Sequence, residues 1–234
     1  MKMVRIVLIV ALVVIVSAGA YAQNTFFPTQ AGTVTTYAHK DARGRVESHT
    51  RQTVKSVEGS GSNMTISYVF EMLDRNQKPQ KTPVELPLTV IVKDDVMILD
   101  MNQMFAGQLK DAQLKMEITG VPMELPGNLQ PGQTLKDANM TMTVNMGIMK
   151  MSTNIKMTDG QCLAIEDVTV EAGTFRSHKI TQTVTANVMK VNTVSKTVAW
   201  YAPGIGTVKT ETYDNRDRLQ NTVELISLTK GNTD

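Results

Sequence analysis

Short segments rich in threonine and valine recur along this chain, and turn-forming residues separate them. Residues 33–40 and 45–57, for example, flank the turn at 41–44, where Gly44 can take a positive φ. β-Branched side chains suit a pleated surface, and their regular alternation with turns is typical of all-β proteins. We therefore predict an all-β fold of about ten to twelve antiparallel strands. So many strands cannot lie as one flat open sheet without exposing apolar faces, so we expect a barrel or half-barrel, or alternatively a two-sheet sandwich.

The other predicted strands follow the same pattern. They are residues 64–73, 84–93, 96–99, 114–119, 140–146, 149–157, 161–170, 175–191, 194–201, 206–213 and 219–228. Pro83 and Pro87 cannot donate ladder hydrogen bonds, which places the segment 84–93 at a sheet edge. Gly147 marks either a hairpin or a glycine bulge in one long strand. The similar segments 32–37 and 206–213 both precede a charged turn and predict two similar hairpins.

One short helix interrupts the strand pattern. Asp100 can cap it, and Met101, Met104, Phe105 and Leu109 recur at helical spacing. We expect this helix to end near Lys110 or Asp111. It could close one end of the sheet.

The first residues have the pattern of a secretory signal peptide. Two basic residues precede the apolar run 6–16, and Ala20-Tyr21-Ala22 is an A-x-A cleavage site. The run is too short to cross a bilayer, which takes roughly 20 residues, and no lipoprotein cysteine follows it. We expect cleavage after Ala22, a single domain over 23–234, and a periplasmic or secreted protein without stable membrane insertion.

The predicted mature chain is formally neutral. Lysine and arginine number 24 and aspartate and glutamate 22 in the full sequence, and two of the basic residues lie in the signal. A neutral, mixed surface predicts neither nucleic-acid binding nor a polybasic patch for an anionic membrane.

Several short blocks resemble a known family. They are Val170-Glu-Ala-Gly-Thr-Phe175, His178-Lys-Ile180, Trp200-Tyr-Ala-Pro-Gly-Ile-Gly-Thr-Val-Lys209 and, earlier, Phe27-Pro-Thr29, Leu125-Pro126 and Leu129-Gln-Pro-Gly-Gln133. Their order and spacing resemble the TapB-like family of exported β-proteins, abundant in Bacteroidetes and also described as domain of unknown function 3108-like. The resemblance implies an exported β-domain and no particular activity. Relatives often carry a cysteine shortly after the Gly-Thr-Phe block, where this chain has Ser177.

Methionine is unusually frequent and forms stripes at the two-residue strand period. Met140, Met142 and Met146 share one face with Val144, and Met149, Met151, Ile155 and Met157 share a face of the next strand. Core packing explains such stripes first. Flexible thioethers also suit an apolar binding surface, and a Cu(I) site is the third interpretation. The candidate ligand-binding residues are Met140, Met142, Met149, Met151, Trp200 and Tyr201, and the last two should point to opposite faces of their strand.

The sequence offers little else that carries chemistry. The histidines lack metal-ligand spacing, although His39 and His49 could meet across the first hairpin. Cys162 lies among apolar residues, as a buried, inert thiol would, and no nucleotide or hydrolase motif occurs. We therefore expect no catalytic residues, no metal and no cofactor.

Two functions fit these observations. The first is a non-enzymatic carrier or sensor of an apolar, lipid-like small molecule held in a β-barrel. The alternative is a structural or interaction module that binds another envelope protein through its sheet surface.

Overall fold

Thirteen antiparallel strands form one sheet in the computed structural model, which describes residues 25–79, 85–100, 115–146, 149–188 and 191–231. The order across the sheet is β6-β8-β9-β10-β11-β12-β13-β1-β2-β3-β4-β5-β7. The strands are β1 (Val34–Asp41), β2 (Val46–Ser60), β3 (Asn63–Leu73), β4 (Glu85–Lys93), β5 (Val96–Asp100), β6 (Lys115–Val121), β7 (Glu124–Pro126), β8 (Ala138–Met146), β9 (Met149–Val170), β10 (Gly173–Val188), β11 (Val191–Ala202), β12 (Gly206–Asp214) and β13 (Leu219–Thr229). The predicted all-β class is confirmed.

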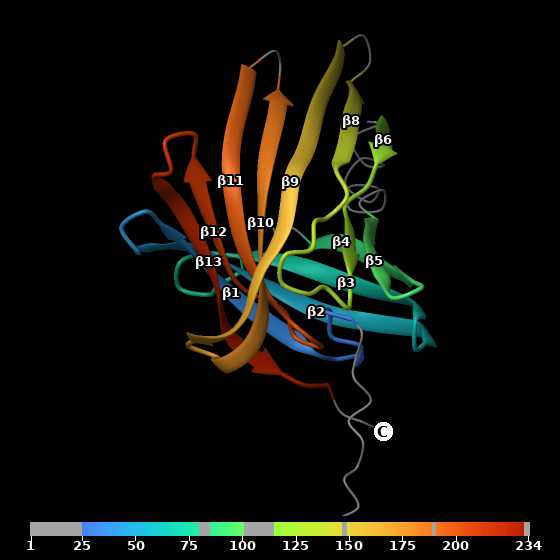
Figure 1. Cartoon of the computed structure of the whole chain (residues 1–234), viewed down its shortest axis with the longest axis vertical. Coiled ribbons are helices and arrows are strands. Elements are labelled where there is room, and N and C mark those ends of the chain that lie inside the picture. Colours follow the sequence, from blue (N-terminus) through green and yellow to red (C-terminus); the bar gives the residue numbers. More distant parts are fainter. Residues whose placement is uncertain (1–24, 80–84, 101–114, 147–148, 189–190, 232–234) are drawn as a thin grey trace, which may run out of the picture.

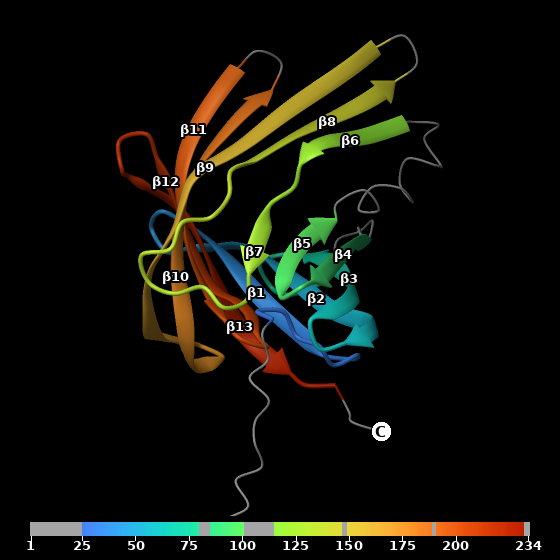
Figure 2. The ribbon, with the colours of Figure 1, turned by 45° about the vertical axis from the view of Figure 1, so that its right-hand side comes forward.

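The sheet curves strongly but does not close. Strands β8 to β11 rise as two long hairpins, while β1 to β5 cross below them (Figures 1 and 2). β6 pairs only with β8, and β7 pairs only with β5, so the two edges of the sheet are not joined by a ladder among the described strands. Of the predicted architectures, the half-barrel therefore describes this sheet best.

Three turns share one hydrogen-bond arrangement. In each, Asp41, Asp74 or Asp214 accepts hydrogen bonds at Oδ1 from backbone N–H groups two and four residues later. The residue three positions after the aspartate has a positive φ in each turn, for example 77° at Gly44 and 54° at Asp217. The β1–β2 and β12–β13 hairpins both use this turn, so the two similar hairpins predicted from the sequence are confirmed.

The segment that precedes β1 runs through the core. Phe26 is fully buried, its backbone N–H lies 3.1 Å from Met97 Sδ, and Gly204 N–H donates to the Thr25 carbonyl. Around Phe26 lies a core of buried side chains from both halves of the sheet, including Ile66 and Ile180. This segment thus links β5 to the β11–β12 turn across the concave side.

Two expectations about strands need correction. β4 is not an edge strand, because β3 pairs with its whole length and β5 pairs with Thr89–Lys93. Pro87 is tolerated because the β5 ladder begins two residues later. The two strands predicted over 149–157 and 161–170 form one strand of 22 residues, β9. Met146 pairs with Met149, so β8 and β9 form a hairpin and not one long strand with a bulge at Gly147.

Two predictions fall outside the described residues: the signal peptide 1–22 and the helix over 100–110 beyond Asp100. Among the residues that the structure does describe, no helix is long and apolar enough to span a bilayer.

Candidate apolar-ligand site

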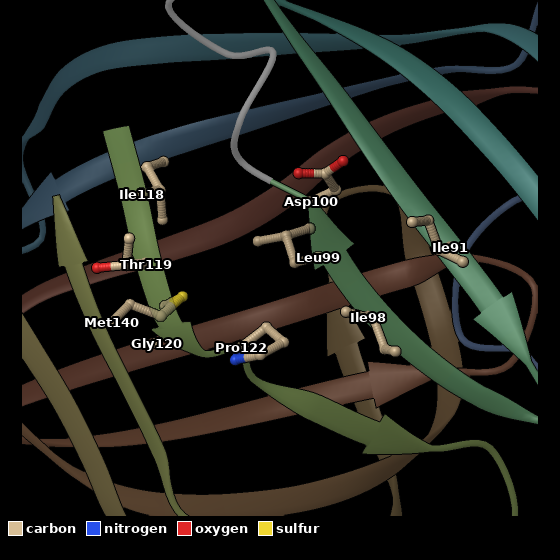
Figure 3. Close-up of a pocket in the computed structure, with 9 residues that line it drawn as sticks. All are labelled: Ile91, Ile98, Leu99, Asp100, Ile118, Thr119, Gly120, Pro122 and Met140. Atoms are coloured by element: carbon tan, nitrogen blue, oxygen red, sulfur yellow. The ribbon is translucent and has the colours of Figure 1, made fainter. Parts of the chain in front are cut away.

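A pocket of about 290 Å³ lies at the open seam between the two ends of the sheet (Figure 3). One wall comes from β4 and β5, through Ile91, Ile98 and Leu99. The other comes from β6 and β8, through Ile118 and Met140. Leu99 and Met140 point toward each other across it.

Among the described strands, no ladder bridges the seam at this point. β7 pairs with β5 over Val96–Ile98 only, so the ladder stops before Leu99. On the other side Gly120, at φ 111°, bends the end of β6, and Pro122 follows it without a backbone donor. The seam is therefore lined by side chains rather than bridged by ladder hydrogen bonds.

The polar groups of the pocket lie at its rim. Asp100 ends β5, and Thr119 lies next to Ile118 on β6. Five aliphatic or thioether side chains against these two polar ones make a cavity suited to an apolar molecule that carries one polar end.

The predicted methionine stripes extend the pocket onto the concave face of the two long hairpins. Ile180 belongs to the core, and Val184 and Ala186 follow it at even spacing on the same face of β10. Across the strands Ala186 pairs with Ile155, which in turn pairs with Met140. Apart from Gln182, which stands between Ile180 and Val184 in the sequence of β10, apolar side chains thus lead from the core to Met140 at the pocket.

The structure separates the predicted methionines. Met140 is buried and lines the pocket, whereas Met142 and Met151 are half-buried further along the same face. Met142 pairs with Ile118, and Met151 pairs with Val144. Met149 begins β9, and the position of its side chain lies outside the described residues.

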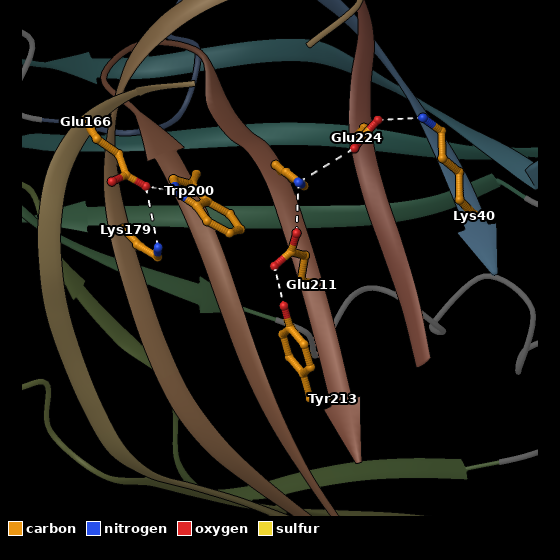
Figure 4. A network of polar contacts seen from close by, with 8 residues as sticks. Lys40, Glu166, Lys179, Trp200, Glu211, Tyr213 and Glu224 are labelled. Atoms are coloured by element: carbon orange, nitrogen blue, oxygen red, sulfur yellow. Dashed lines mark hydrogen bonds and ion pairs between the residues drawn. The ribbon is translucent and has the colours of Figure 1, made fainter. Parts of the chain in front are cut away.

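Trp200 and Tyr201 do not join this site. Tyr201 lies on the concave face, where its ring centroid is 5.8 Å from that of Phe26. Trp200 lies on the convex face within a polar network (Figure 4). Its Nε1–H donates to Glu166 at 2.7 Å, and Lys179 and Lys209 approach its ring from the flanking strands, at 5.1 Å and 5.4 Å.

The network extends from Trp200 across β12 and β13. Lys209 contacts Glu211 at 2.8 Å and Glu224 at 3.9 Å, and Lys40 of β1 contacts Glu224 at 2.5 Å. Tyr213 donates to Glu211 at 2.6 Å, which raises the pKa of Tyr213 to about 12. Each carboxylate has a cation partner, so the network is electrically balanced and fixes the indole in place.

The remaining candidates for chemistry are isolated. His39 Nε2 lies 2.7 Å from Thr50 Oγ1, and His49 Nδ1 lies 2.9 Å from the Asp74 carbonyl, so the two rings do not form a pair. Cys162 is fully buried, and burial raises the pKa of its thiol. Within the described ranges no three histidine, cysteine or carboxylate side chains are placed to hold a metal ion.

Sequence reasoning found one of the pocket residues, Met140, and missed its partners. The apolar residues of β4 and β5 gave a strand signal, but nothing local to the sequence shows that these strands meet β6 across a seam. Only the pairing of distant strands brings Ile98 and Ile118 to one cavity.

Comparison with known proteins supports the fold. Residues 30–225 match the model of the DUF3108-like family. A protein from Bacteroides fragilis, described as exported with a YmcC-like fold, superimposes with a TM-score of 0.68 at 20% identity, over 88% of this chain and 99% of its own. A protein described as a lipoprotein, from Parabacteroides distasonis, gives a TM-score of 0.70 at 21% identity, over 87% and 98%. No curated protein matches the chain.

Proposed function

The chain belongs to the DUF3108-like family, and from that premise and the seam pocket we propose that it is a non-enzymatic envelope protein that binds one apolar molecule. The observation that carries the proposal is the cavity of about 290 Å³ lined by Ile91, Ile98, Leu99, Ile118 and Met140. Its volume lies just below the usual range of ligand pockets, roughly 300–1,000 Å³. A single alkyl chain fits this volume better than a two-chain lipid.

The polar rim suggests how such a ligand would lie. The alkyl chain would replace water against the aliphatic walls, where each buried methylene contributes about 0.8 kcal/mol. The polar end would stay near Thr119 and the end of β5, in contact with solvent. The protein then acts as a carrier or sensor and performs no reaction on the ligand.

Thermal unfolding with and without ligand tests the proposal. A saturated fatty acid and the alcohol of the same chain length are the probes, because a response to both depends on the alkyl chain. A ligand at a hundredfold excess over its Kd should stabilise the protein by about 2.7 kcal/mol. Organic extraction of protein from its native envelope, followed by mass spectrometry, identifies any natural ligand.

Two methionine variants give a matched comparison. Met140→Phe places a larger, rigid ring in the pocket and should weaken the thermal shift. Met151→Phe adds the same volume on the same apolar face but away from the pocket, and should leave the shift unchanged. If neither probe shifts the melting temperature and nothing apolar is extracted, the carrier function is wrong. A module that binds another envelope protein would then be the better description.

A further inference from the structure

The rim of the seam pocket carries one charge. Among the described residues that line the pocket, Asp100 is the only one with a charged side chain, and the walls are aliphatic or thioether groups. Asp100 is the last residue of β5 and lies next to Leu99 in Figure 3. A head group that stays at the rim while its alkyl chain enters the pocket therefore comes close to a carboxylate.

The β-ladder fixes the position of this carboxylate. Asp100 pairs with Thr89 of β4 at the end of the β4–β5 ladder, and Thr89 is buried. Asp100 itself is half-buried. The field of a partly buried charge is screened by salt less than that of a fully exposed one. The charge therefore acts on whatever occupies the rim.

The neighbouring strands add little net charge to the rim. Lys115 and Glu117 lie two residues apart on β6 and have opposite signs, and β8 contains no charged residue. The charged residues 93–95 form the turn at the far end of β5. They lie roughly 16 Å from Asp100 along the strand, at about 3.3 Å per residue, which exceeds the Debye length of about 8 Å in physiological salt.

Asp100 discriminates between head groups because a carboxylate only accepts hydrogen bonds. An ionised carboxylate offers about four acceptor sites and no donor. It can therefore accept from an ammonium or a hydroxyl group in addition to the interaction that it already makes within the protein. A second carboxylate finds no donor there and is repelled. Thr119, the other polar group at the rim, can donate as well as accept and does not discriminate.

We propose that the seam pocket selects a single-chain amphiphile whose head group donates hydrogen bonds: a protonated amine binds most tightly, a neutral alcohol less tightly and a free fatty acid least. This inference rests on the proposed function, since it names the chemical class of the molecule held in that same pocket. Burial of the alkyl chain depends on apolar area and treats the three head groups alike. Asp100 is then the residue that determines specificity.

Calorimetric titration of the full mature chain with dodecylamine, dodecanol and dodecanoate tests the proposal. Each probe is kept below the concentration at which it forms micelles, and near neutral pH the amine is protonated and the acid ionised. We expect the Kd to rise about threefold from amine to alcohol and again from alcohol to acid, so that amine and acid differ by about tenfold. High salt should reduce this difference and change the Kd of the alcohol little.

Three variants test the role of the charge. Asp100→Asn removes the charge at nearly constant size and should bring the three Kd values within about twofold of one another. Glu117→Gln removes a charge from an exposed position on β6, outside the pocket lining as the structure describes it, and should keep the difference of about tenfold. Asp100→Glu keeps the charge and should preserve the order of the probes, which separates loss of charge from loss of fold.

The inference is overturned if wild type binds the three probes equally or the acid most tightly, or if Asp100→Asn keeps the order seen in wild type. The proposed carrier function would survive each of these results. If none of the probes binds, the carrier function fails and the inference fails with it. Met140→Phe should weaken binding of all three probes alike and leave their order unchanged, because it alters the pocket wall and not the rim.

Discussion

Trp200 and Tyr201 are consecutive in β11 and serve opposite faces of the sheet: the Trp200 indole donates to Glu166 at 2.7 Å on the convex face, and the Tyr201 ring lies 5.8 Å from the Phe26 ring on the concave face. Trp200 is only 7% exposed because lysine side chains cover it. It is the only tryptophan in the chain, so its fluorescence reports on this network alone.

Replacing Trp200 by phenylalanine should destabilise the protein by about 1–3 kcal/mol, because Glu166 loses a charge-assisted donor and the lysines lose their best aromatic partner. Urea unfolding followed by circular dichroism measures the change. Glu166→Gln keeps an acceptor for the indole N–H and should cost less, since its side chain is 43% exposed. An equal cost for both variants would contradict the assigned hydrogen bond.

The core segment before β1 gives a second prediction. Phe26→Ala should cost about 3–5 kcal/mol, because the ring is fully buried against His178 and Tyr201 and leaves a cavity. Phe27→Ala is the matched control and should cost less, since Phe27 is only partly buried at the edge of the core. Similar costs for both would show that the segment is not anchored through Phe26.

The sequence was sufficient to predict strands, turns and the opposite orientation of Trp200 and Tyr201, because these depend on the two-residue period and on turn chemistry within a few residues. It could not place β7 or the pairing of β13 with β1, because the three residues of β7 lie in a proline-rich connection and β1 and β13 are far apart in sequence. Met140 was identified as a candidate through its stripe. Ile91 and Ile98 were not, since their role depends on where the sheet stops pairing.

Acid should weaken the Asp214 turn. Hydrogen bonds from the side chain and backbone of Arg218 lower the pKa of Asp214 to about 2, from 3.8. A lowered carboxyl pKa contributes stability above the unfolded value, and this stability is lost as pH falls from 3.8 toward about 2. Asp214→Asn should therefore melt below wild type at neutral pH, and the difference should shrink through this window.

Calorimetry at several pH values checks this expectation. Asp41→Asn should behave in the same direction, because Arg45 lowers the pKa of Asp41 through the same contacts. A difference between wild type and variant that stays constant across the window would contradict the assignment.

Cys162 should react slowly with thiol reagents in the native protein. It is fully buried, and burial raises the pKa of its thiol, so both access and thiolate fraction are low. Labelling should become fast only on unfolding in urea. Rapid labelling of native protein, with unchanged circular dichroism, would show that the core around Ile180 opens locally.

His178 should make the protein less stable below about pH 6.5. Burial lowers the pKa of its imidazole, and the backbone of Tyr201 and Leu129 opposes this only in part. Nδ1 is buried and has no hydrogen-bond partner among the described residues, and the ring packs edge-on against Phe26 at 4.9 Å. The unfolded chain therefore takes up a proton more readily than the folded one, so the stability from this group is fully present above pH 6.5 and is lost as pH falls from there toward the folded pKa.

His178→Phe keeps a ring against Phe26 and removes the titration, so the loss of stability between pH 7 and pH 5 should be smaller than in wild type. The pKa of His39 is also lowered by burial, and His39→Gln separates its contribution. Urea unfolding at each pH measures the effect, and an identical pH dependence in wild type and His178→Phe would assign it to other groups.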